Sequence, residues 1–99
     1  MVYEIADIHV VTGHESEFEA AVRQAVPLFQ RASGCSGMEL QRVIEKPGKY
    51  RLVVEWETVE HHMVHFRGSP DFQEWRRLVG GHLAAPPAVE HSTTVVHGF

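Results

Sequence analysis

Hydrophobic residues recur along the first third of the chain in two different periods. Residues 2–11 are rich in Val, Ile and Tyr and stop at Thr12-Gly13, a combination that predicts a strand followed by a turn. Between residues 14 and 32, apolar side chains are spaced three and four apart, which predicts an amphipathic helix. Gly34 is a natural end for that helix. The chain therefore begins with a strand and a helix.

The middle of the chain alternates apolar and polar residues with a period of two. Residues 38–44 and 50–57 are predicted to be two strands, and Pro47-Gly48 between them is typical of a short loop. The second of these strands alternates cleanly. Side chains two apart on a strand point to the same face. The second of these strands therefore places four large apolar residues on the face expected to meet the helices: Tyr50, Leu52, Val54 and Trp56.

Helical spacing returns in the last third of the chain. Val59, Met63 and Phe66 predict a short helix over residues 59–67, before Gly68. Ser69-Pro70 then combines a favoured N-cap with a favoured first helical residue, so a second helical segment is expected to start there. Residues 89–97 are β-branched enough to predict a final strand.

The order strand, helix, strand, strand, broken helix, strand predicts an α+β fold. It is the β-α-β-β-α-β arrangement of a ferredoxin-like antiparallel sheet with helices on one face. The first strand carries apolar residues on both faces, and two helical regions cannot cover both sides of the sheet. We therefore expect a homodimer in which the sheet faces of two subunits pack together.

Composition limits the range of functions. Residues 1–99 are enough for a single domain, with apolar and charged residues mixed along the chain. Nine Lys and Arg against thirteen Asp and Glu give a net charge of −4 without a basic patch, so no nucleic-acid partner is expected. No apolar run is long enough to span a membrane, so no membrane partner is expected either. One cysteine, Cys35, cannot form an internal disulfide, which favours a cytoplasmic location.

Eight histidines are the most unusual feature of the composition. His61 and His65 are four residues apart and share a helix face, which is a metal-ligand spacing, but no third ligand is specified. We therefore expect surface imidazoles there rather than a metal site. His65 precedes Phe66 and can project between helix and sheet, as a structural or a catalytic histidine. The helix is short, so the sequence leaves open which of His61, His62 and His65 faces inward.

Aromatic residues at helix-facing positions have two interpretations. They can line a flat apolar pocket for a planar ligand, or they can simply pack in the hydrophobic core. The residues concerned are Trp56, Phe66, Phe72 and Trp75. Arg76 can pair with a phenolate or carboxylate, or can be an exposed helix residue. The chain has no glycine-rich dinucleotide or phosphate loop, no nucleophile elbow and no thiolate cluster, so no cofactor is expected.

Several segments together are similar to one known family. They are Glu55-Trp56-Glu57-Thr58, His61-His62-Met63-Val64-His65-Phe66-Arg67-Gly68-Ser69, Phe72-Gln73-Glu74-Trp75-Arg76, Ala84-Ala85-Pro86-Pro87 and Val89-Glu90-His91. Earlier segments agree, namely Thr12-Gly13-His14-Glu15 and Gly34-Cys35-Ser36-Gly37-Met38-Glu39-Leu40. This pattern resembles the antibiotic biosynthesis monooxygenases, which are small dimeric α+β barrels. Some members of that family oxidise phenolic aromatics with molecular oxygen and no flavin, metal or haem.

The resemblance implies roles for particular residues. His65 and Arg76 are the expected catalytic pair, as base and donor, and five residues are the expected substrate-binding set: Trp56, Phe66, Phe72, Trp75 and His62. Haem-degrading relatives of the superfamily carry an Asn, a Trp and a His where this chain has about Ala6, Phe66 and Arg76. That mismatch argues against haem degradation.

Two functions from different classes follow from the sequence. The first is a cofactor-independent monooxygenase that acts on a phenolic, quinol or polyketide-like aromatic. The second is a non-catalytic dimeric ligand-binding or interaction module of the same fold, in which the aromatic residues only pack. A planar ligand needs a cavity of about 300 Å³ or more, so a filled core would favour the module.

Overall fold

Four strands form one antiparallel sheet in the order β2-β3-β1-β4, in a computed structural model that describes residues 1–99. The strands are β1 (Val2–His9), β2 (Cys35–Arg42), β3 (Lys49–Trp56) and β4 (Ala88–Ser92). The helices are α1 (Glu15–Gln30), the π-helix η1 (His61–Phe66), α2 (Pro70–Val79) and the short 3-10 helix η2 (Gly80–His82). This order confirms the predicted α+β, ferredoxin-like fold.

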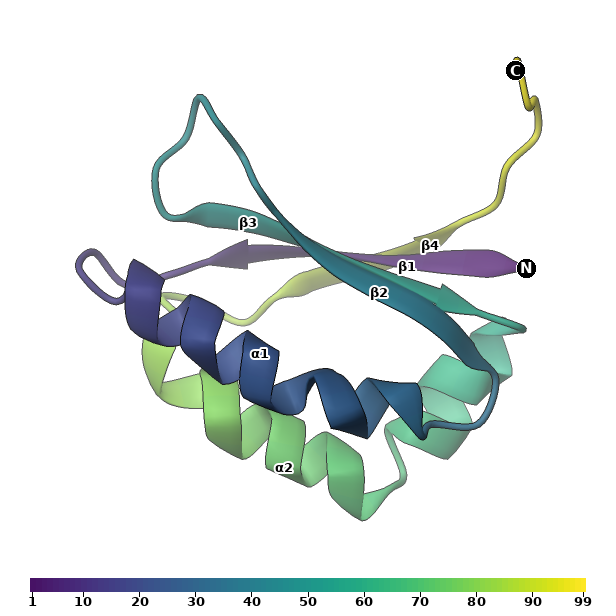
Figure 1. Cartoon of the computed structure of the whole chain (residues 1–99), viewed down its shortest axis with the longest axis horizontal. Helices are drawn as coiled ribbons and strands as arrows, with labels where there is room; N and C mark the ends of the chain where they lie inside the picture. Colours follow the sequence, from purple (N-terminus) through teal and green to yellow (C-terminus); the bar gives the residue numbers. More distant parts are fainter.

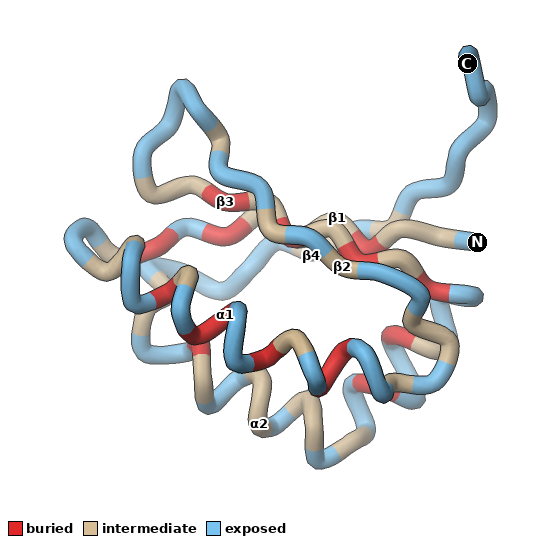
Figure 2. The backbone as a smooth tube through the Cα atoms, viewed as in Figure 1, coloured by how far each residue is buried: buried red, intermediate tan, exposed pale blue.

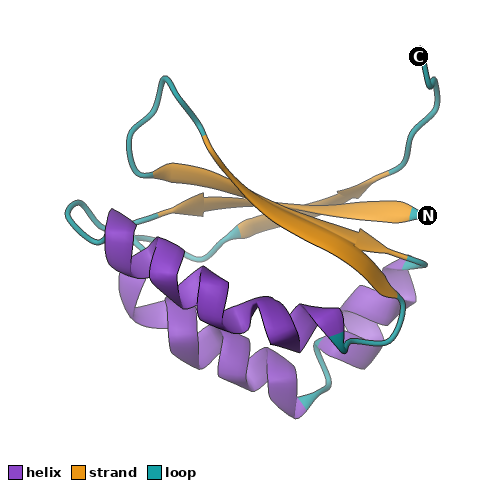
Figure 3. Cartoon of the chain, in the orientation of Figure 1, coloured by secondary structure: helices purple, strands orange, loops and turns teal.

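The helices lie on one face of the sheet and leave the other face without a helical layer (Figures 1 and 3). Buried segments of α1, β1 and β3 face one another across the layer between helices and sheet (Figure 2). No helix has both the length and the apolar character that crossing a membrane requires.

The alternation of residues along β3 explains which of its faces is buried. Its four large helix-facing residues are at most 1% exposed, as the sequence pattern predicts: Tyr50, Leu52, Val54 and Trp56. The side chains between them are only half-buried. On α1, Phe18 is fully buried and its ring lies 5.0 Å from the ring of Tyr50. The packing of α1 against β3 therefore follows directly from the two hydrophobic periods in the sequence.

The helix before Gly68 differs from the prediction in its phase. Phe66 is buried as expected, but Val59 and Met63 are about 40% exposed, and His62 is buried instead. The helix has π geometry, in which the Arg67 amide donates to the His62 carbonyl five residues back. The wider turn helps to bring His62 and Phe66 onto the buried side, so the face predicted from Val59 and Met63 is wrong.

The final strand is shorter than predicted. It ends at Ser92, whereas the sequence pattern extends it to residue 97. The remaining tail leads away from the sheet, and its apolar residues Val95, Val96 and Phe99 are exposed (Figure 1). Because β4 pairs with β1 only from Ala88 to Ser92, the tail has no strand partner within the chain.

Ser69 caps α2 as the Ser-Pro pair predicts. Its hydroxyl accepts a hydrogen bond from the Phe72 amide at 3.3 Å and donates one to the Phe66 carbonyl at 2.6 Å. Replacing Ser69 with alanine should lower the free energy of unfolding by about 1 kcal/mol, because the Phe72 amide and the Phe66 carbonyl each lose one of their two hydrogen bonds. Urea unfolding measures this change. Ser33→Ala, in an exposed turn, is the control, and an equal effect of both substitutions would contradict a capping role.

Candidate active site

A cleft of about 1010 Å³ opens between the sheet and α2. Its lining comes from the helix-facing side of β1, β3 and β4, from η1 and α2, and from the loop after η2. Ten of its 19 lining residues are hydrophobic. The volume exceeds the 300 Å³ or so that a planar aromatic ligand needs. The space between the sheet and α2 is therefore large enough for such a ligand.

Glu4 is a buried carboxylate in the wall of this cleft. It belongs to the helix-facing row of β1, where its neighbours Ala6 and Ile8 are apolar, and it is only 6% exposed. The Trp56 indole donates a hydrogen bond from Nε1 to Glu4 Oε1 at 3.0 Å. Burial raises the pKa of Glu4, while the Trp56 hydrogen bond and the charge of Arg67 partly oppose this. Glu4 is thus a stronger base than an exposed glutamate.

His62 lies over Glu4 and links it to a second imidazole. His62 Nε2 is 3.2 Å from Glu4 Oε1, and His62 Nδ1 is 2.8 Å from Nε2 of His91. The His62 ring stacks on the indole of Trp56, with ring centres 5.4 Å apart. Burial lowers the pKa of His62 to about 4, and the charges of His91 and Arg67 add to this. His62 is therefore neutral at physiological pH.

The three groups form a continuous chain of hydrogen bonds from the cleft to β4. When the proton of neutral His62 is on Nε2, it donates to Glu4, and His62 Nδ1 accepts from His91. When Glu4 is protonated, the direction reverses, so that Glu4 donates to His62 and His62 donates to His91. A proton taken up at Glu4 can therefore pass through His62 to His91, which is only half-buried. Glu4 and His62 line the cleft.

The opposite wall of the cleft combines aromatic rings with arginines. Phe72, Trp75 and Arg76 line it from α2, and Arg67 lines it from the end of η1. The guanidinium groups of Arg67 and Arg76 lie 5.7 and 6.0 Å from the centre of the Phe72 ring. Neither arginine forms an ion pair, whereas the third arginine of the lining, Arg77, is held by Glu74. An anionic aromatic ligand would find both ring contacts and positive charge here.

The residues expected from the sequence fall into three groups. Four of them line the cleft: His62, Phe72, Trp75 and Arg76. Trp56 and Phe66 are buried core residues behind it, and Trp56 contacts the site through Glu4. His65 is exposed and does not line the cleft, because the phase of η1 turns His62 inward instead.

Sequence reasoning missed Glu4 and His91. The signal for Glu4 was present, since it is the one charged residue in the alternating row Val2, Glu4, Ala6, Ile8 and Val10. His91 lies directly opposite Glu4 in the pairing of β4 with β1. The sequence of β4 alone does not show which of its residues lies opposite which residue of β1. Of the cleft lining, only Glu4 and His62 can ligate a metal, one fewer than a catalytic zinc site takes.

Comparisons with known proteins agree with this fold. YczJ of Bacillus subtilis (strain 168) is 44% identical over 91 residues, which cover 92% of this chain and 96% of that protein. A Bordetella bronchiseptica protein with a crystal structure is 58% identical, covers 96% of this chain and 97% of its own, and superposes with a TM-score of 0.95. It carries the family name antibiotic biosynthesis monooxygenase.

More distant structures share the fold alone. SnoaB, a cofactor-independent oxygenase from Streptomyces nogalater, was solved as a point mutant and is 18% identical, with a TM-score of 0.83 over 98% of this chain and 95% of that one. The family model for antibiotic biosynthesis monooxygenase matches residues 1–78. The match spans β1 through most of α2, including Glu4 and His62. This chain belongs to the antibiotic biosynthesis monooxygenase family.

Proposed function

We propose that this protein is a monooxygenase that oxidises a phenolic, quinol or polyketide-like aromatic with molecular oxygen and without a cofactor. The observation that carries the proposal is the buried Glu4–His62–His91 chain in the wall of a cleft whose other wall is aromatic and cationic. The description of SnoaB as a cofactor-independent oxygenase supports the reaction class.

Each part of the cleft has a task in this reaction. Phe72 and Trp75 bind the planar substrate, and Arg76 stabilises the anion formed when its hydroxyl is deprotonated. Glu4 is the base, because its raised pKa brings it closer to the pH at which proton transfer is efficient. His62 and His91 carry the proton away, which returns Glu4 to its basic form.

The electron-rich anion itself supplies the reducing power. It passes one electron to oxygen, and the two radicals combine to a peroxide on the ring carbon. Loss of water from that peroxide leaves a carbonyl. The substrate loses two hydrogens, one from its hydroxyl and one from the ring carbon, and that carbon gains one oxygen atom. The second oxygen atom leaves as water, so electrons and atoms balance.

Oxygen uptake tests the proposal. Metal-stripped protein is assayed over a panel of hydroquinones and anthrones, against autoxidation without protein. The expected result is saturable oxygen uptake above that control. Added substrate should also quench the fluorescence of Trp75, which lines the cleft. Uptake that equals the control across the panel, although the compounds bind, would contradict the proposal and favour a non-catalytic binding module.

We also propose that two subunits pair through the sheet face opposite the helices. Tyr3, Ile5 and Val53 are only half-buried there, and Ile5 is paired directly with Val53. Asp7 and Arg51 flank them and lie 3.4 Å apart. An apolar centre with a polar rim is typical of a subunit interface. A second sheet on this face would complete the predicted dimeric barrel, since the sheet of one chain is open.

Ile5→Arg should convert the dimer to a monomer, because it places an unpaired charge at the centre of the proposed interface. Sedimentation equilibrium should give about twice the 11.2 kDa chain mass for the wild type and one chain mass for the variant. Gln24→Arg, on the exposed side of α1, is the control and should stay dimeric. A monomeric wild type at micromolar concentration would refute the interface.

A further inference from the structure

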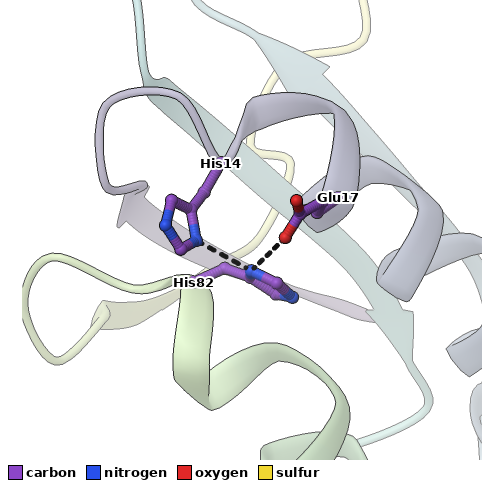
Figure 4. Close-up of side chains that lie close together, drawn as sticks. All are labelled: His14, Glu17 and His82. Carbon is purple, nitrogen blue, oxygen red and sulfur yellow. Dashed lines mark hydrogen bonds and ion pairs between the residues drawn. The ribbon is translucent and has the colours of Figure 1, made fainter.

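Three side chains from two distant parts of the sequence converge outside the cleft. His14 precedes α1, Glu17 lies in its first turn, and His82 ends η2. Figure 4 shows a nitrogen of the His14 ring close to a nitrogen of the His82 ring, with the Glu17 carboxylate directed toward His82. The proposed reaction uses none of these residues.

The distances between their ligand atoms are close to those of a metal site. His14 Nδ1 is 3.2 Å from His82 Nδ1, and His82 Nδ1 is 3.8 Å from Glu17 Oε2. All three ligand atoms lie within 4.8 Å of one another. A tetrahedral zinc ion with bonds of about 2.0–2.2 Å separates its ligands by about 3.3–3.6 Å. The histidine pair is thus within about 0.2 Å of the required spacing, and the exposed Glu17 side chain is free to adjust.

The backbone holds the two histidines in place. The Val11 amide donates to the His82 carbonyl at 2.9 Å, and the His14 amide donates to the Val11 carbonyl at 2.9 Å. Both histidines are therefore anchored to the same residue and are only half-buried. A prearranged pair loses little conformational entropy when it binds an ion.

We propose that His14, Glu17 and His82 bind a divalent transition metal, with Zn²⁺ as the first candidate. Two imidazoles and one carboxylate are a donor set that zinc accepts, with the fourth position left to water. Binding needs both imidazoles neutral with their protons on Nε2, and the Glu17 charge offsets that of the ion. The ion would fasten the start of α1 to the segment after α2. Because Gly80 and Leu83, on either side of His82, line the cleft, the ion would stabilise the wall of the cleft rather than take part in the reaction.

Metal titration of untagged, chelator-treated protein tests the site. We expect one equivalent of Zn²⁺ per chain, measured by competition with a chromophoric chelator, and a tetrahedral visible spectrum with Co²⁺. His14→Ala and His82→Ala should each weaken Zn²⁺ binding at least about tenfold, and Glu17→Gln should weaken it less. Zn²⁺ should raise the unfolding temperature of the wild type but not that of His82→Ala.

His65→Ala is the matched control, because His61 and His65 form another closely spaced histidine pair outside the cleft, with ring centres 5.4 Å apart. This variant should bind Zn²⁺ like the wild type. Three outcomes would overturn the proposal: no binding by the wild type, equal weakening in every variant, or loss of binding in His65→Ala with retention in His82→Ala. The last outcome would place the ion on η1.

Discussion

Glu4→Gln should lower turnover by about 10²-fold or more while leaving the protein folded. A positioned general base typically accelerates a reaction by about 10²- to 10⁴-fold, and its loss removes that acceleration. Glutamine has the same shape, and its carbonyl oxygen can still accept the Trp56 indole and His62 Nε2–H, but it cannot take a proton from the substrate. The substitution also removes a buried carboxylate whose charged form burial disfavours, so the variant should be at least as stable as the wild type at neutral pH.

Steady-state oxygen uptake with a panel substrate measures the change in turnover. Glu60→Gln, an exposed carboxylate just before η1, is the matched control and should turn over like the wild type. His65→Ala should also retain activity, because its side chain is exposed outside the cleft. Full activity of Glu4→Gln with loss in His65→Ala would return the role of base to His65 and refute the proposed relay.

Acidification should destabilise the fold through His62. The pKa of His62 is lowered from 6.5 to about 4 in the folded state, so between these values the unfolded chain binds more protons than the folded one. Stability attributable to this residue is therefore full above pH 6.5 and is lost as the pH falls toward 4. The loss between pH 7.5 and pH 5 should be about 2 kcal/mol in the free energy of unfolding.

Urea unfolding at these two pH values measures the effect by comparison with His62→Gln. Glu4 acts in the opposite direction, since a raised pKa in the folded state favours folding at lower pH. The test therefore compares the change in the free energy of unfolding with pH between the wild type and His62→Gln, rather than that change in the wild type alone. His62→Gln should lose about 2 kcal/mol less than the wild type over this range. Parallel losses would mean that His62 is not held neutral by burial.

The fold was predictable because its elements follow simple periods. The alternation of β3 and the three- and four-residue spacing of α1 each fix a buried face, and Ser69-Pro70 marks the start of α2. The failures lie where local pattern is weak. Around η1 the apolar residues Val59 and Met63 suggested one buried face, but the π geometry and the packing against Trp56 place His62 and Phe66 on the buried side instead.

The site was only half predictable for a related reason. Side chains on one helix, such as Phe72, Trp75 and Arg76, could be grouped from their spacing alone. Glu4 and His91 come together through the pairing of β1 with β4, which joins the two ends of the chain. His14 and His82 are likewise 68 residues apart in the sequence. Contacts of this kind depend on strand register and loop packing, which a single sequence does not encode in any short pattern.

Labelled oxygen gives the most direct test of the proposed activity. Metal-stripped protein would be incubated with ¹⁸O₂ and whichever panel hydroquinone or anthrone gives the highest uptake, and the product would be analysed by mass spectrometry. We expect one labelled oxygen atom in each product molecule, the other appearing in water, and about 10²-fold less labelled product with Glu4→Gln. A product without label, or oxygen recovered as hydrogen peroxide in amounts equal to the substrate consumed, would contradict it.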